Sequence, residues 1–125
     1  MTSNLTTNIG LALSLVIIVY SFFNVVRATR NPAGFARAFG VAAPDEPSFV
    51  YVYGIRTLFI ALFGLALIVS GQTQALALFV LVAAIMPLLD LALVWQRGAP
   101  TSTRVRHALI AAFLLVTAFL VSRGA

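Results

Sequence analysis

The sequence predicts an all-α integral membrane protein: a four-helix bundle with a short interfacial helix between its first two spanning helices. Hydrophobic residues make up 62% of the 125 residues and charged residues 9%, whereas soluble domains carry about 25% charged residues. The apolar residues fall into four runs, each near the ~20 residues that a helix needs to cross ~30 Å of hydrocarbon. The polar gaps between the runs are short, so we expect one domain over residues 1–125.

Each expected span is bounded by residue types that begin or end helices. Thr7 or Asn8 would cap the first helix. Pro47 suits the first turn of the second helix, and Gly71 suits its end. Pro87 lies inside the third span, where it frees a backbone carbonyl and is expected to kink the helix. The four spans are expected at residues 9–26, 48–70, 74–95 and 102–121.

The connection between the first two spans carries its own helix signals. Asn31 is a capping residue, Pro32 suits a first helical position, and Gly40 suits a left-handed stop. Phe35 and Phe39 lie one turn apart between these signals, so they share a face. We therefore expect a short helix in the membrane interface, with a disordered basic loop as the alternative.

The arginines predict how the chain is oriented. All eight basic residues are arginines, and the formal net charge is +5. Six of them lie in the first and third connections, the second connection has none, and only Arg123 opposes this imbalance. Because basic short loops stay in the cytoplasm, both termini are expected to face outward from a cell (inner) membrane. The basic flanks fit contact with anionic membrane lipids rather than nucleic acid. The six arginines are Arg27, Arg30, Arg37, Arg97, Arg104 and Arg106.

Several kinds of chemical site are not expected. The chain has no cysteine and one histidine, His107. Thiolate sites, disulfides and haem ligation by two histidines are therefore excluded, and no metal or cofactor is predicted. A Ser–His–Asp arrangement is not expected, because His107 would have to reach Asp90 from a helix end.

Two charges lie inside otherwise apolar spans. Arg56 and Asp90 would each cost roughly 2.5 to 3.5 kcal/mol at a helix centre. Arg56 lies ~12 Å and Asp90 ~10 Å from the cytoplasmic ends of their helices, at 1.5 Å per residue. Their common depth on antiparallel neighbours predicts an intramembrane ion pair. A structural role for this pair in locking the helices together stays open. So does pairing of Asp90 with Arg97.

Other polar side chains lie at the same depth, on all four expected helices. They predict a polar site that opens toward the cytoplasmic leaflet, where a small molecule would bind. The candidate ligand-binding residues are Tyr20, Asn24, Tyr53, Arg56, Asp90 and His107.

Two short segments and one aspartate of the sequence carry a family resemblance. Residues 35–41 (FARAFGV), residues 51–56 (YVYGIR) and Asp90 resemble a family of small four-helix membrane proteins grouped as a domain of unknown function. The resemblance covers Val25 to Val121, and it extends more distantly to DoxX proteins. Family members often have an acidic residue directly after the arginine, where this chain has Thr57. The DoxX likeness implies a role beside membrane oxidoreductases or quinones.

The sequence leaves several functions open. The first is an accessory or scaffold component, or a binder of a lipid-like small molecule, acting within a membrane complex or homo-oligomer. The second is an acid–base enzyme on an isoprenoid or quinone-like substrate, in which Asp90 transfers a proton, Arg56 binds an oxyanion and Tyr53 orients the substrate. A proton-coupled transporter using Asp90 ranks lower. Small multidrug transporters rely on a carboxylate in the first helix, and this chain has none there.

Overall fold

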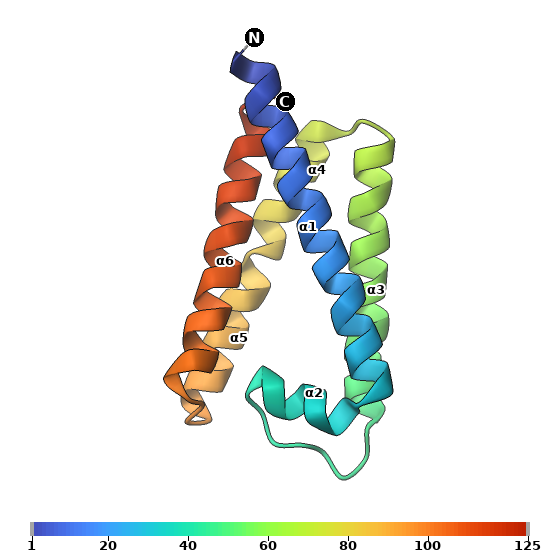
Figure 1. Cartoon of the computed structure of the whole chain (residues 1–125), viewed down its shortest axis with the longest axis vertical. Coiled ribbons are helices and arrows are strands. Elements are labelled where there is room, and N and C mark those ends of the chain that lie inside the picture. The colour runs from blue at the N-terminus through green and yellow to red at the C-terminus, as the bar shows by residue number, and fades with distance from the viewer. Residues whose placement is uncertain (1, 125) are drawn as a thin grey trace.

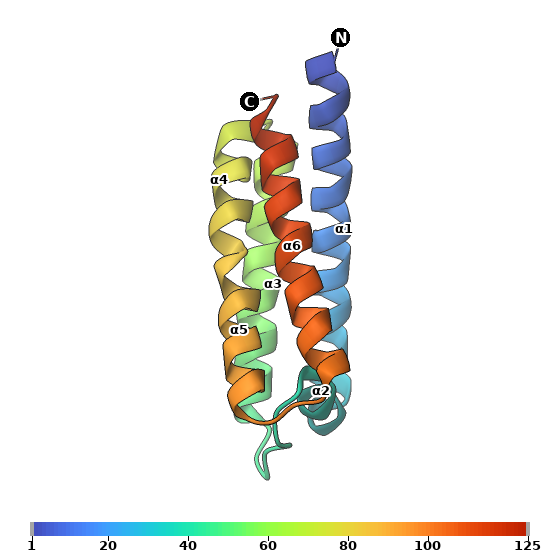
Figure 2. The ribbon, with the colours of Figure 1, turned by 90° about the vertical axis from the view of Figure 1, so that its left-hand side faces the viewer.

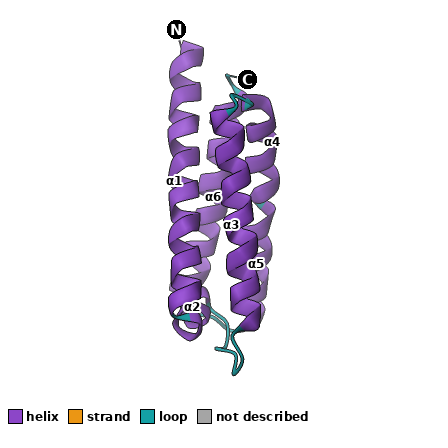
Figure 3. Cartoon of the chain, turned by 90° about the vertical axis from the view of Figure 1, so that its right-hand side faces the viewer, coloured by secondary structure: helices purple, strands orange, loops and turns teal. Residues whose placement is uncertain are grey.

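A computed structural model describes residues 2–124, and within them the chain is helical apart from short connections (Figures 1 and 3). Four segments are long and apolar enough to cross a membrane, so the chain is a small multi-pass membrane protein. The third of these segments consists of two helices, α4 and α5. The helices are α1 (Thr2–Arg30), α2 (Pro32–Phe39), α3 (Ser48–Val69), α4 (Thr73–Ala83), α5 (Ile85–Gln96) and α6 (Thr101–Ser122).

The expected boundaries hold within one residue except in the first span. The helix α1 begins at Thr2 and ends at Arg30, so Asn8 lies inside the helix, and the cap predicted at Thr7 or Asn8 is wrong. Residues 2–8 contain neither Gly nor Pro to stop the helix. At the other end, Pro32 disfavours helical geometry at Asn31, and α1 therefore ends one residue earlier.

The third span is broken at Ala84, which separates α4 from α5. Pro87 lacks the N–H group that would bond to the carbonyl of Ala83, four residues earlier. The break lies at the turn where this bond is missing, which is the place where the sequence predicted that Pro87 would disturb the helix.

The spans converge at one end of the molecule and separate at the other. Both termini lie at the converging end, and α2 lies across the opposite end (Figures 1 and 2). Near the termini α1 crosses α6 closely, because a Cβ atom at Gly10 would lie 2.8 Å from the backbone nitrogen of Val121. Toward the α2 end α1 packs instead on α3, where Gly54 faces Ala28.

Two clusters of buried apolar side chains follow from this arrangement. The cluster at the terminal end lies mainly between α4 and α6, and it includes Leu76, Val80, Leu114 and Val121. The second cluster joins α1, α2 and α3 at the other end. It consists of Ala28, Phe35, Ala36 and Val50, with Phe39, Val41 and Tyr53 packed against it.

The helix expected in the first connection is present as α2. The Asn31 side chain accepts a hydrogen bond from the Gly34 N–H, and Pro32 is the first helical residue. Gly40 ends the helix at φ 105°, in the left-handed region that favours glycine. Phe35 and Phe39 face the bundle rather than lipid, since both rings stack on Tyr53 of α3.

A pair of glycine substitutions tests the crossing of α1 and α6. In Gly10→Ala the new methyl group would meet the α6 backbone at 2.8 Å, so we expect a loss of about 1–3 kcal/mol in the free energy of unfolding. In the matched variant Gly54→Ala, the methyl group lies 3.8 Å from Ala28, which is ordinary contact. That change should be neutral or stabilising by up to about 1 kcal/mol, through helix propensity.

Thermal unfolding of both variants in detergent measures the difference. Equal Tm values for Gly10→Ala and Gly54→Ala would contradict the close crossing.

Candidate functional site

The α2 end of the bundle is closed by a row of aromatic rings. The Tyr53 ring lies 5.3 Å from the Phe35 ring and 5.9 Å from the Phe39 ring, between centroids. The Phe39 ring in turn meets the His107 ring edge-on at 4.8 Å. Tyr53 belongs to α3 and His107 to α6, so α2 joins two helices that diverge from each other at this end.

Side chains of α6 satisfy the last carbonyl groups of α2. His107 Nε2 lies 2.9 Å from the Phe39 carbonyl oxygen and must be the donor, because a carbonyl only accepts. The Arg106 guanidinium donates to the Ala38 carbonyl. The last carbonyls of a helix lack partners within that helix, and its C-terminus favours positive charge. Both contacts therefore fix α2 under the bundle.

This capping changes the interpretation of His107. From the sequence, His107 was a candidate ligand-binding residue. In the structure the side chain is only 4% exposed and bonds to α2. No sequence signal marked this contact, because the two residues it joins are 68 positions apart.

Polar side chains from different helices lie close to α2, on the side of α2 that faces the bundle. Asp90 of α5 is half-buried and lies within electrostatic range of His107 and of Tyr53. Tyr53 also lies within range of Tyr20 of α1. Asn24 is buried at the same end of α1. Four of the six predicted site residues, Asn24, Tyr53, Asp90 and His107, are thus buried or partly buried at the α2 end, whereas Tyr20 is 41% exposed.

The sixth, Arg56, is placed differently from the prediction. Its side chain is exposed on α3, and among residues 2–124 no basic group lies within 4 Å of the Asp90 carboxylate. The expected ion pair of Arg56 with Asp90 is therefore not formed, nor is the alternative pair with Arg97. Equal depth was necessary for the pair but not sufficient, because α3 packs on α1 and α4 whereas α5 packs on α6 and α4.

The described part of the chain holds no group of three or more His, Asp or Glu side chains that could bind a metal ion. The chemistry that this site offers is hydrogen bonding and charge. It comes from one carboxylate, one imidazole, one amide and two phenols.

A comparison with protein families matches residues 9–121 to DUF4267, a domain of unknown function. The match covers nearly the whole chain. The protein belongs to the DUF4267 family. No curated protein and no solved structure matches the chain. The resemblance to a small membrane family of unknown function is thereby confirmed, and the DoxX likeness stays a prediction.

The DUF4267 match includes every element of the site. It begins within α1, contains α2 to α5 whole and ends at Val121 of α6. The family domain therefore contains the row of aromatic rings, which includes Tyr53, and it contains Asp90. The two segments that carried the resemblance, residues 35–41 and 51–56, are the α2 segment and the α3 turns that face each other across the Phe35 and Tyr53 rings.

Substitution of His107 tests how α2 is held. In His107→Leu the Phe39 carbonyl loses its donor, and a buried unpaired carbonyl costs about 1–3 kcal/mol. We expect a lower Tm and faster backbone hydrogen exchange within α2. The control is Thr117→Val in the same helix, whose buried hydroxyl bonds only to the Phe113 carbonyl of α6 itself. The control should leave the exchange of α2 unchanged. Unaltered exchange in His107→Leu would contradict the capping role.

Proposed function

We propose that this membrane protein binds a lipid-like small molecule between α3 and α5, with the head group of that molecule at Asp90 and Tyr53. The half-buried carboxylate of Asp90, which has no ion-pair partner within 4 Å in residues 2–124, carries the proposal. The site faces the end of the bundle that α2 closes.

The energetics of Asp90 support a ligand. A carboxylate inside a membrane helix costs roughly 2.5 to 3.5 kcal/mol, and such residues commonly mark binding sites or proton pathways. Asp90 lies six residues before the end of α5, about 9 Å along the helix axis at 1.5 Å per residue. A head group with O–H or N–H donors would offset the cost of the carboxylate, and the Tyr53 hydroxyl would bond to the same head group.

The packing of the helices supports a position between α3 and α5. These two helices make their main contacts with other helices, so a tail could lie between them without separating a packed interface. Pro87 lies one turn before Asp90 and leaves the Ala83 carbonyl without its helical donor. Arg56 is exposed on α3 one turn beyond Tyr53, where its guanidinium would meet the rim of the site.

The same geometry favours binding over the other functions considered. A scaffold needs no half-buried carboxylate. The acid–base enzyme required Arg56 beside Asp90, and the exposed position of Arg56 does not favour that arrangement. A quinone-type molecule remains the best probe, because its carbonyl or hydroxyl head group and apolar tail match the polar and apolar parts of the site.

Quinone binding can be read from Trp95, the one tryptophan of the chain. Trp95 follows Asp90 by five residues on α5, about 7.5 Å along the axis. Decylubiquinone should therefore quench its fluorescence with a saturable component in detergent. Asp90→Leu should weaken that component at least about tenfold, which corresponds to about 1.4 kcal/mol. The control Leu89→Ala, on the exposed face of α5, should keep it. Equal saturable quenching in both variants would count against a site at Asp90.

The orientation belongs to the same proposal, because it places the site in the cytoplasmic half of the membrane. The arginine imbalance predicts that both termini face outward, and both termini do lie at one end of the molecule (Figure 1). A C-terminal fusion to a reporter active only outside the cytoplasm should be active, and one to a cytoplasm-only reporter should be silent. The reverse pattern would move the site to the outer leaflet and leave the fold unchanged.

A further inference from the structure

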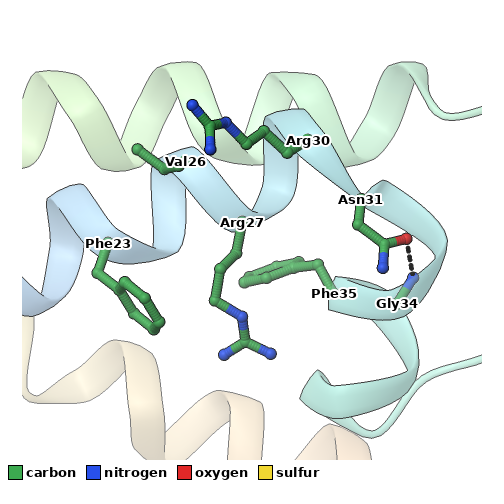
Figure 4. A pocket seen from close by; sticks show the side chains of 7 residues that line it. All are labelled: Phe23, Val26, Arg27, Arg30, Asn31, Gly34 and Phe35. Atoms are coloured by element: carbon green, nitrogen blue, oxygen red, sulfur yellow. Dashed lines mark hydrogen bonds between the residues drawn. The ribbon is translucent and has the colours of Figure 1, made fainter.

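We infer that a second site, formed by α1 and α2, binds the phosphate group of an anionic phospholipid. A pocket of about 400 Å³ opens at the junction of these helices, and Asp90 and Tyr53 do not line it. The pocket is therefore separate from the site proposed at Asp90 and Tyr53. The pocket is lined by Phe23, Val26, Arg27, Arg30, Asn31, Gly34 and Phe35 (Figure 4).

The position of the Arg27 guanidinium is fixed by aromatic rings rather than by a counter-ion. Its central carbon lies 5.5 Å from the centre of the Phe23 ring and 5.9 Å from that of the Phe35 ring. Figure 4 shows the side chain extending between the two rings. Within residues 2–124 no carboxylate lies within 4 Å of it. Cation–π contacts orient a guanidinium and leave its five N–H donors free for a phosphate.

The start of α2 adds further donors to the same pocket. The Asn31 side-chain oxygen accepts the Gly34 N–H at 3.0 Å, which leaves the Asn31 amide nitrogen free to donate (Figure 4). The N-terminus of a helix also carries partial positive charge. Arg30 lines the pocket and is exposed. A phosphate beside Arg27 would thus have N–H donors from Arg27, Arg30 and the Asn31 amide group within one pocket.

The lining also indicates a lipid rather than free phosphate. Arg27 directly follows the apolar run that ends at Val26 and lies three residues from the end of α1, so we expect it at the level of the lipid head groups. Phe23 and Val26 continue the lining toward the membrane interior and would contact an acyl chain. Basic pockets between membrane helices are a recognised means of binding anionic head groups.

Native mass spectrometry of the detergent-solubilised protein tests the site. Phosphatidylglycerol is titrated into the wild type and into Arg27→Gln, Arg27→Lys and Arg123→Gln. Arg123 is a matched control, because its guanidinium carbon also lies 5.5 Å from a phenylalanine ring, that of Phe119, but at the opposite end of the molecule. Phosphatidylcholine with the same acyl chains and inorganic phosphate serve as competing ligands.

We expect the apparent Kd for phosphatidylglycerol to rise about tenfold in Arg27→Gln, to rise less in Arg27→Lys and to stay unchanged in Arg123→Gln. Phosphatidylcholine should bind at least about tenfold more weakly than phosphatidylglycerol, because its choline group repels the arginines. Equal weakening by Arg27→Gln and Arg123→Gln would overturn the site. Displacement of the lipid by equimolar inorganic phosphate would overturn the lipid assignment.

Protein stability is measured alongside. If Arg27→Gln lowers the lipid-free Tm more than Arg123→Gln does, the lipid titration is repeated with Arg30→Gln in place of Arg27→Gln. Arg30 is an exposed residue of the same pocket. An unchanged Kd in Arg30→Gln would then overturn the inference.

Discussion

The hydrogen bond from His107 to the Phe39 carbonyl determines how the separated end of this bundle is closed. At the terminal end the helices meet directly, with Gly10 against Val121. At the other end α1 and α3 lie away from α5 and α6, and α2 fills the space between them (Figure 1). The last carbonyls of α2 would be costly in an apolar setting without donors, so the donors of α6 make this placement of α2 stable. The polar site and the lipid pocket both border α2.

Much of the fold could be predicted from the sequence, because the lipid bilayer restricts the length and composition of the helices that cross it. Run length and hydropathy define the spans, since a membrane helix must satisfy its own backbone and present apolar side chains. The α2 helix was predictable because Asn31, Pro32 and Gly40 each have a local conformational preference. The ends of α1 were harder to predict from the sequence, because the helix extends beyond the apolar run. At its C-terminal end it continues until Pro32 stops it.

The site was predictable in depth but not in direction around each helix. Counting residues gives a height along the helix axis, and that height correctly placed Tyr53, Asp90 and His107 together. The height does not say which neighbouring helix a side chain faces. The direction of a side chain depends on which helices pack against each other. Arg56 has the expected height, yet α3 packs on α1 and α4, and the guanidinium is exposed. The capping of α2 by His107 was missed for the same reason.

The contact between α6 and α2 also constrains how the protein is made. His107 and Phe39 are 68 residues apart, and ribosomes add about 5 to 20 residues per second. The α2 segment is therefore synthesised roughly 3 to 14 s before its capping partner. During that interval its last carbonyls must bond to water at the membrane surface. The His107 contact can therefore form only after the final span has been synthesised, whereas α2 can pack on α3 through the Phe35 and Tyr53 rings before that.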